Sequence, residues 1–319
     1  MRYSAIIIGI KGKQLNNDEI DFFKKCKPLG VILFSRNIFF KEQTINLVQQ
    51  IKSLLGRDTM ILVDQEGGRV TRLAATKWKT FPPAKYFGDL ANKNMRKAKK
   101  ETFNNYKDIG KNLYDLGINF NCAPVLDLFI NGANKVIGDR AFSSRADIVS
   151  KLALEACKGL LASNVIPIIK HIPGHGRAKS DSHLELPEIK TKKKFLEKDF
   201  LPFIELNYMP LAMVAHIKYL NLDEIYCATY SRVIIDQYIR GKIGFNGILL
   251  SDDLCMKALK GPYYNRAKKA KNAGCEILLH CDANLSNTYN SYLGAGFVSK
   301  KLLNKLHFIK KSISNKKFS

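Results

Sequence analysis

Residues suited to acid–base chemistry are concentrated in one short stretch of the chain, 170–183. This stretch holds three of the six histidines and places Asp181 two residues before His183. A carboxylate so close to an imidazole can orient the ring and stabilise its charged form, so the pair is a candidate proton donor and acceptor. The glycines and the proline of the stretch predict a loop rather than a helix or strand. For His175 we favour a structural role within that loop.

Other ionisable residues follow apolar segments elsewhere in the chain. They are Asp64 and Glu66, Asp127, Lys170 and His171, His216, and Asp252 and Asp253. One acidic residue after a strand is commonly a helix cap, but recurrence after several predicted strands indicates a shared polar rim. A ring of carboxylates and cations suits sugar binding with glycosidic chemistry, for which Asp252 is our candidate nucleophile. A metal site is the alternative, and spacing alone does not decide between the two.

Eight short apolar segments are predicted to form the buried strands that position these residues. They are 5–10, 30–34, 60–63, 118–123, 165–169, 211–216, 247–250 and 276–282. Apolar residues at helical spacing lie between most of them, most clearly over 97–116 and 148–160. This alternation predicts parallel strands joined by helices, and eight such units predict a single (β/α)8 TIM-type barrel. An open doubly wound sheet is the alternative, but no GxGxxG motif follows the first strand.

The domain organisation is predicted to be simple. We expect a catalytic barrel over 1–312 and a short, flexible basic tail over 313–319. No stretch approaches the roughly 18 apolar residues of a membrane-spanning helix. Seven scattered cysteines without a CxxC pair indicate reduced thiols rather than disulfides or zinc ligands. We therefore expect a cytoplasmic protein with no stable membrane association.

The charge of the chain is unusually positive. Lys and Arg number 52 against 28 Asp and Glu, a formal net charge of +24. Such an excess can indicate a nucleic-acid or anionic-surface partner. We favour a compositional bias on solvated faces, because the lysine clusters at 96–100, 190–194 and 316–317 have few aromatic residues among them. No nucleic-acid partner is therefore expected.

Six segments, taken together, resemble glycoside hydrolase family three in its bacterial β-N-acetylhexosaminidase branch. They are 63–70, 123–127, 138–142, 170–176, 181–183 and 251–256. The resemblance extends over about residues 5–285, in the order and spacing of the family. Its most specific part is the sequence KHIPGHG followed by DSH, over 170–183.

This resemblance implies a retaining exo-β-N-acetylglucosaminidase that needs no metal and no cofactor. It assigns Asp252 as nucleophile, His183 as general acid and then base, and Asp181 as the residue that orients His183. The positions matched to the terminal N-acetylglucosamine are Asp64, Arg72, Arg140, Lys170 and His171. The implied substrate is N-acetylglucosaminyl-1,6-anhydro-N-acetylmuramic acid, with or without its peptide, in cell-wall recycling. We expect the protein to be a monomer.

Several alternatives remain open from the residues alone. The chain could be a β-glucosidase of the same family, a basic nucleic-acid-binding protein on a barrel, or an inactive muropeptide sensor. A histidine base repels phosphate less than a carboxylate does, so phosphate could replace water as acceptor. Arg177 and Lys179 depart from the acidic or small residues usual in the catalytic loop, which bears on loop closure and aglycone preference. Glu66 and Asp127 are expected to support the rim, and Asp253 is expected to support the site or cap a helix rather than act as nucleophile. His171 could cap its strand, and His280 and His307 are expected to have no catalytic role.

Overall fold

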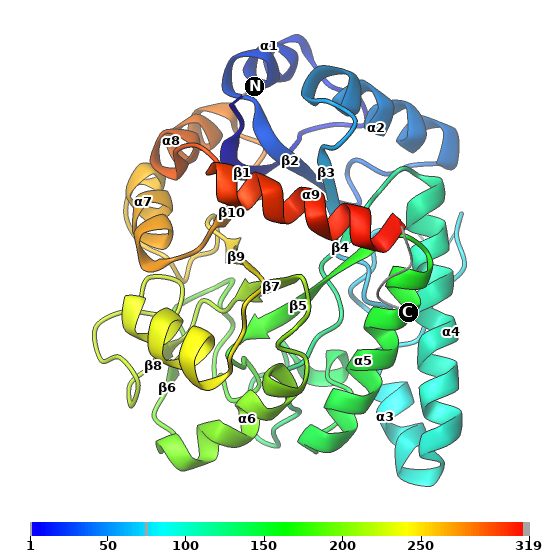
Figure 1. Cartoon of the computed structure of the whole chain (residues 1–319), viewed down its shortest axis with the longest axis vertical. Helices are drawn as coiled ribbons and strands as arrows, with labels where there is room; N and C mark the ends of the chain where they lie inside the picture. The colour runs from blue at the N-terminus through cyan, green and yellow to red at the C-terminus, as the bar shows by residue number, and fades with distance from the viewer. Residues whose placement is uncertain (1, 74–75, 315–319) are drawn as a thin grey trace.

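The computed structural model describes residues 2–73 and 76–314, and its centre is a closed barrel of parallel strands in the order β1-β10-β9-β7-β5-β4-β3-β2 (Figure 1). The barrel strands are β1 (Ser4–Gly9), β2 (Pro28–Leu33), β3 (Met60–Val63), β4 (Phe120–Asn121), β5 (Ile166–Ile172), β7 (Leu211–Val214), β9 (Ile248–Asp253) and β10 (Ile277–His280). The first and last strands pair in parallel and close the sheet. The predicted (β/α)8 barrel is therefore confirmed, and the open sheet is excluded.

Helices surround the barrel on its outer face (Figure 1). They are α1 (Asn17–Cys26), α2 (Lys41–Leu55), α3 (Ala84–Lys93), α4 (Met95–Asp115), α5 (Ala146–Ala162), α6 (Lys193–Glu205), the π-helix η2 (Ile234–Lys242), α7 (Tyr263–Ala273) and α8 (Leu285–Ala295), with the short 3-10 turn η1 (Gly138–Arg140). The helix predicted over 97–116 is α4, and the helix predicted over 148–160 lies within α5. No helix within the described ranges is long and apolar enough to cross a membrane.

Two apolar clusters share the barrel strands between them. In β1, Ile6 and Ile8 pack outward with the helices, while Ala5 and Ile7 pack inside the barrel. This follows from the period of two in a strand, which sends successive side chains to opposite faces. A fully buried isoleucine contributes roughly 1.5–3 kcal/mol, so both faces of each strand hold the barrel together.

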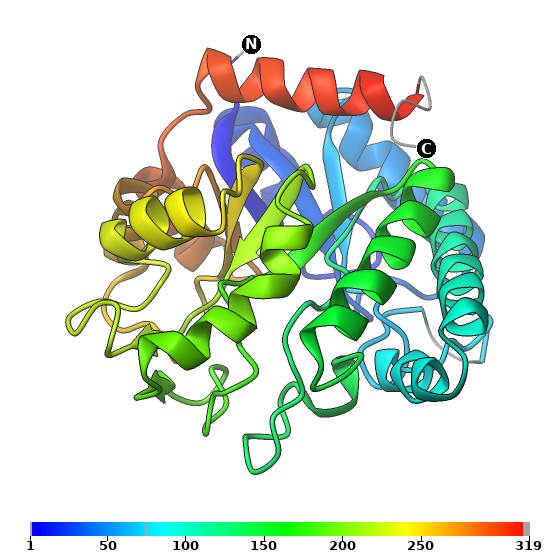
Figure 2. The ribbon, with the colours of Figure 1, turned by 60° about the horizontal axis from the view of Figure 1, so that its bottom comes forward.

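The final helix, α9 (Lys300–Ser314), closes one end of the barrel. Its Leu302, Leu306 and Ile309 belong to the apolar cluster inside the barrel. Figure 2 shows this helix lying across one end of the barrel, while long loops project from the other. The end that remains open is the one at which the strands finish, where parallel barrels carry their active sites. Of the predicted tail over 313–319, the first two residues continue α9, and 315–319 lie outside the described residues.

Several elements differ from the sequence-based prediction. Strand β5 continues to Ile172 and β9 to Asp253, each three residues beyond its predicted end, so 170–172 is strand and not loop. The segment 118–123 is regular strand only at β4, because Asn119 and Asn121 accept the backbone N–H groups of Ile61 and Gln65 through their side chains. A small second sheet of β6 (Glu188–Ile189) and β8 (Lys218–Tyr219) lies beside the barrel and was not predicted. Strands of two residues carry too little periodicity to be found in a sequence.

Candidate active site

A cavity of about 360 Å³ opens at the carboxyl ends of the strands. All eight predicted site residues line it: Asp64, Arg72, Arg140, Lys170, His171, Asp181, His183 and Asp252. They come from the ends of β3, β5 and β9, from the loop after β3, from η1 and from the loop after β5. The structure therefore brings together residues as far apart in the chain as Asp64 and Asp252, which are separated by 188 positions.

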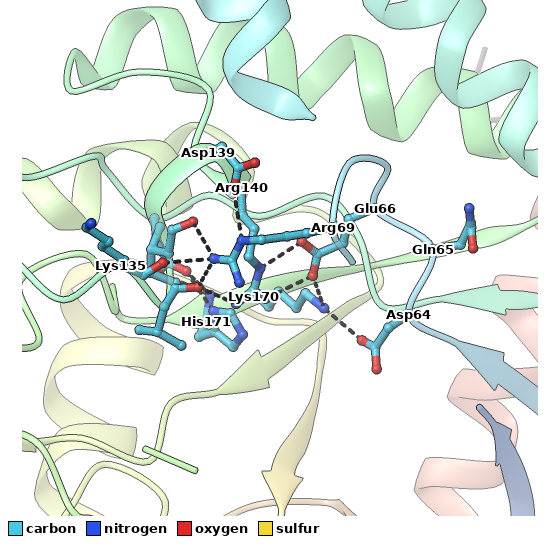
Figure 3. Close-up of polar contacts among 12 residues, drawn as sticks. Asp64, Gln65, Glu66, Arg69, Lys135, Asp139, Arg140, Lys170 and His171 are labelled. Carbon is cyan, nitrogen blue, oxygen red and sulfur yellow. Dashed lines mark hydrogen bonds and ion pairs between the residues drawn. The ribbon is translucent and has the colours of Figure 1, made fainter. Parts of the chain in front are cut away.

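Lys170 is the centre of a buried ionic network at this cavity (Figure 3). Its Nζ lies 2.8 Å from Asp64 Oδ1 and 2.7 Å from Glu66 Oε1. Glu66 also accepts two hydrogen bonds from the Arg140 guanidinium, at 2.8 and 2.9 Å. The network holds two cations against two carboxylates within the cavity wall, in the paired geometry that buried charges require.

The charges of this network stabilise one another. Burial alone would raise the pKa of Glu66, but Arg140 and Lys170 outweigh it and hold that pKa well below its usual range. Burial alone would lower the pKa of Lys170, but Asp64 and Glu66 outweigh it and raise that pKa. All of these side chains are therefore ionised at neutral pH, which gives the cavity fixed donors and acceptors for hydroxyl groups.

Arg72 approaches Asp64 from the loop that follows β3. Its Nη2 lies 3.5 Å from Asp64 Oδ2, and its guanidinium lies over the Phe34 ring at 5.5 Å. Within the described chain, the buried Nε of Arg72 meets no hydrogen-bond acceptor. The Arg72 side chain as a whole is 26% exposed and lines the cavity, so its guanidinium can contact a ligand there.

Asp127 organises the beginning of the loop that follows β5. Its carboxylate lies 2.6 Å from His171 Nδ1 and accepts the backbone N–H of His175 at 2.5 Å. Burial would raise the pKa of Asp127, but the neighbouring His171 and His175 outweigh it and lower that pKa. The ionised carboxylate can only accept, so His171 Nδ1 carries the hydrogen and Nε2 is left for other contacts. His171 is thus held by a carboxylate in the cavity wall.

Asp181 and His183 form the predicted dyad. Asp181 Oδ1 lies 2.8 Å from His183 Nδ1 and accepts the His183 backbone N–H at 2.9 Å. The hydrogen bonds from His183 outweigh partial burial and lower the pKa of Asp181, so Nδ1 of the ring donates to an ionised carboxylate. The His183 side chain is 65% exposed, which leaves its Nε2 accessible for proton transfer.

Asp252 lies at the end of β9 and faces the same cavity. Burial would raise the pKa of Asp252, but His216, His171 and the backbone N–H of Asp253 outweigh it and lower that pKa to about 2. The hydrogen bond from Asp253 N, at 2.8 Å, is the direct backbone contact that stabilises the charge of Asp252. An ionised carboxylate on a rigid strand is suited to nucleophilic attack.

The Asp253 carboxylate, next to the candidate nucleophile, accepts hydrogen bonds from the backbone. Its Oδ1 accepts the N–H groups of Cys255 and Cys281, at 2.9 and 3.0 Å, which ties the end of β9 to the end of β10. His216 supports the same region, because its Nε2 lies 2.9 Å from the Asp253 carbonyl oxygen and must donate to it. The positions of both residues agree with a supporting role.

The two remaining histidines lie away from the cavity. His280 Nδ1 lies 2.8 Å from Ser291 Oγ, and its ring packs against Tyr263 behind the end of β10. His307 lies on α9, at the closed end of the barrel, beside a second hollow of about 280 Å³. Within the described ranges, no group of three His, Cys, Asp or Glu residues is placed to hold a metal ion.

Two contacts of the site were missed at the sequence level. Arg69 pairs with Asp139 at 2.9 Å and donates to the carbonyl oxygens of Lys135 and Val136, which fixes the loop that carries Arg140. Arg69 falls in one of the segments that resemble the family, so that resemblance was the signal available. The second contact joins His175 to Ser182, at 3.1 Å, and no sequence pattern indicates it.

Known proteins resemble this chain over most of its length. The sequence profile described as the Glycosyl hydrolase family 3 N terminal domain matches residues 7–308. A beta-hexosaminidase of Alkalilimnicola ehrlichii is 36% identical over 287 residues, which is 88% of this chain and 82% of that protein. A beta-hexosaminidase of Haemophilus influenzae is 34% identical over 287 residues, which is 88% of this chain and 80% of that protein.

A solved structure repeats the fold. NagZ of Neisseria gonorrhoeae, in complex with N-trifluoroacetyl-D-glucosamine, superimposes with a TM-score of 0.88 at 28% identity. The similarity covers 99% of this chain and 93% of the other.

Proposed function

This chain belongs to glycoside hydrolase family 3, and we propose that it is a retaining exo-β-N-acetylglucosaminidase. The observation that carries the proposal is that the ionised Asp252 and the Asp181–His183 dyad line one cavity together with fixed cations. The beta-hexosaminidase relatives and the complex of the Neisseria protein with an N-acylated glucosamine support the same sugar.

The terminal sugar would bind in the cavity against the ionic network of Asp64, Lys170, Glu66 and Arg140. The Asp64 carboxylate accepts hydroxyl groups, while Lys170 and Arg140 donate to sugar oxygens from positions that Glu66 fixes. Arg72 offers the exposed part of its guanidinium, which lines the cavity beside Asp64. His171 offers Nε2, because Asp127 occupies Nδ1. Each donor is preorganised before the sugar arrives, which is how a site favours binding at low entropic cost.

The first chemical step breaks the glycosidic bond. His183 Nε2 donates a proton to the glycosidic oxygen as the bond between that oxygen and the anomeric carbon breaks. An Asp252 carboxylate oxygen forms a new bond to the anomeric carbon and gives a covalent glycosyl-enzyme. Asp181 holds the His183 ring and stabilises its charged form before the proton is transferred.

The second step releases the sugar. The neutral His183 accepts a proton from a water molecule, whose oxygen attacks the anomeric carbon while the bond to Asp252 breaks. Two successive displacements retain the configuration of the anomeric carbon. A histidine takes the place of the second carboxylate of most glycosidases, and the 65% exposure of the His183 side chain leaves the ring accessible to the attacking water.

The natural substrate in this proposal is N-acetylglucosaminyl-1,6-anhydro-N-acetylmuramic acid, with or without its peptide, during peptidoglycan recycling. We place this activity in the cytosol. All seven cysteines are free thiols, which favours a reducing compartment.

Hydrolysis of 4-nitrophenyl β-N-acetylglucosaminide tests the proposal. Wild-type protein should release nitrophenol, and Asp252→Asn should lose at least about 10³-fold in kcat, in the range observed when catalytic nucleophiles are removed. Proton NMR of the first-formed sugar should show the β-anomer. Equal rates for the two proteins would exclude Asp252 as nucleophile. Parallel reactions in phosphate buffer should form free sugar, and sugar 1-phosphate would show that phosphate is the acceptor.

A further inference from the structure

Ser182 is the buried member of an otherwise accessible catalytic segment. Its neighbours Asp181 and His183 have side chains that are 29% and 65% exposed, whereas Ser182 is only 2% exposed. A small polar residue that is buried between a half-buried and an exposed neighbour indicates that the backbone at this point is anchored to the protein. The catalytic dyad is therefore fixed to the barrel at the residue between its two members.

Two other parts of the barrel rim hold this anchor. Ser182 Oγ lies 3.1 Å from His175 Nε2, at the beginning of the same loop. The Ser182 carbonyl oxygen accepts the backbone N–H of Ala258 at 3.2 Å, and Ala258 belongs to the loop that follows Asp252. The position of the dyad is thus fixed by two contacts, one with the beginning of the loop after β5 and one with the loop after β9, which follows the nucleophile.

His175 is itself held in one place. Its backbone N–H donates to Asp127, and its ring lies edge-on to the His171 ring with centroids 5.3 Å apart. Burial lowers the pKa of His175 to about 4, so the ring is neutral at pH 7. Within the described chain, Nδ1 of this ring has no hydrogen-bond partner, and Nε2 is hydrogen-bonded to Ser182 Oγ.

We propose that the hydrogen bond between His175 and Ser182 is a positioning contact, which sets the His183 ring at the glycosidic oxygen. This inference rests on the proposed function, because it assigns His183 as the general acid. Neither His175 nor Ser182 transfers a proton in it. Their contact determines where the Asp181–His183 pair stands relative to Asp252, and loss of it lets the segment move without removing any reacting group.

A positioning role makes a prediction about leaving groups that a structural role does not. General acid catalysis matters most for a leaving group that needs a proton, and it matters little for one that departs as a stable anion. In Ser182→Ala, kcat/KM for phenyl β-N-acetylglucosaminide should therefore fall about tenfold, a fraction of the 10²–10⁴-fold supplied by a general acid. For the 2,4-dinitrophenyl glycoside, kcat/KM should change by less than about twofold. The ratio of the two values is independent of the fraction of protein that is folded.

Matched variants complete the test. Ser180→Ala removes a hydroxyl from the same loop where the structure shows no hydrogen bond to it, and it should keep the wild-type ratio. Ser182→Thr keeps the hydroxyl and should restore most of the phenyl activity. His175→Phe should reproduce the Ser182→Ala ratio, and the double variant should be no worse than either single variant.

The outcomes separate the inference from the proposed function. Wild-type protein that hydrolyses neither glycoside would overturn the proposed function. Wild-type activity combined with an equal loss on both glycosides in Ser182→Ala, or with no loss, would overturn the positioning role. Additive losses in the double variant would also overturn it, because they would show that the two side chains act separately.

Discussion

Replacing Glu66 by Gln tests how the ionic network maintains the sugar site. Glu66 has a side chain that is 5% exposed, and it neutralises Arg140 and Lys170 together. The amide keeps the shape of the side chain but removes the charge. Asp64, which also pairs with Arg72, is then the carboxylate left in the network beside Arg140 and Lys170, whose side chains are 11% and 3% exposed. The perturbation therefore leaves an uncompensated positive charge in the cavity wall.

The size of the effect follows from this burial. Removing one partner of a buried ion pair costs about 3–5 kcal/mol. A protein of 319 residues has an unfolding entropy of about 0.67 kcal/mol per kelvin, so the melting temperature should fall by about 4–8 °C. Because Arg140 and Lys170 lose their common acceptor, we also expect KM for 4-nitrophenyl β-N-acetylglucosaminide to rise about tenfold, which corresponds to ~1.4 kcal/mol of binding.

The pH dependence gives the experiment a second readout. The pKa of Glu66 in the folded protein lies below its ordinary value of 4.5. Its contribution to stability is therefore complete above pH 4.5 and is lost as the pH falls further, because the unfolded chain binds the proton more readily. Glu66→Gln should lose this part of the acid sensitivity.

Calorimetry and steady-state kinetics on Glu66→Gln and Glu197→Gln would measure these effects. Glu197 pairs with Lys242 at 2.5 Å, but both side chains are about half exposed, at 50% and 44%. An exposed pair contributes at most about 1 kcal/mol, so the control variant should melt within about 2 °C of the wild type. Equal melting temperatures and an unchanged KM in both variants would refute the assignment of Glu66 as the residue that holds the network.

Three further changes have definite expectations. Asp127→Asn removes a charged acceptor from the backbone and ring of His171. In steady-state kinetics KM should rise about tenfold, and in calorimetry the melting temperature should fall. An unchanged KM would argue against a role for His171 in sugar binding. Gly176→Ala would place a methyl group 2.0 Å from the Leu128 carbonyl oxygen and should cost about 1–3 kcal/mol in urea unfolding, and a neutral result would contradict this packing. Asp199 pairs with Arg177 at 2.5 Å, but burial outweighs this pair and raises the pKa of Asp199 to about 6 from 3.8. The folded state therefore binds the proton more tightly, and the contribution of Asp199 to stability should fall by an amount on the order of 3 kcal/mol as the pH rises from 4 to 6. Asp199→Asn should show no such fall, and a slope equal to that of the wild type would contradict the shift.

Most of the fold could be predicted from the sequence because strands buried on both faces have a strong local signature. Segments such as 60–63 and 247–250 are nearly continuous apolar runs, and both are barrel strands, although β9 continues three residues beyond its predicted end. The boundaries of β4 could not be predicted, because asparagine side chains take over backbone hydrogen bonds on either side of it. Such side-chain substitution depends on the neighbouring strand, which a local pattern does not contain.

The eight predicted site residues line one cavity, whereas the contacts among them could not be predicted. Asp64, Lys170, His171 and Asp252 share one cavity because strand ends meet at one rim in a parallel barrel, and the other four predicted residues reach it from loops and from η1. That Glu66 serves both Arg140 and Lys170 depends on the path of the loop after β4. The burial of Ser182 between two exposed neighbours likewise depends on packing against the β9 loop, through Ala258. Contacts between distant loops have no sequence period that could reveal them.

The central claim is that Asp252 becomes bonded to the sugar during turnover. Reaction of the wild-type protein with 2-acetamido-2-deoxy-5-fluoro-glucosyl fluoride, whose fluorine slows release of the sugar, should allow the intermediate to accumulate. Peptide mapping by mass spectrometry should then locate the added sugar on the peptide that contains Asp252, with fragment ions that assign it to that carboxylate. A sugar bonded to any other residue would contradict the account, as would an enzyme that turns over this reagent while the Asp252 peptide stays unlabelled.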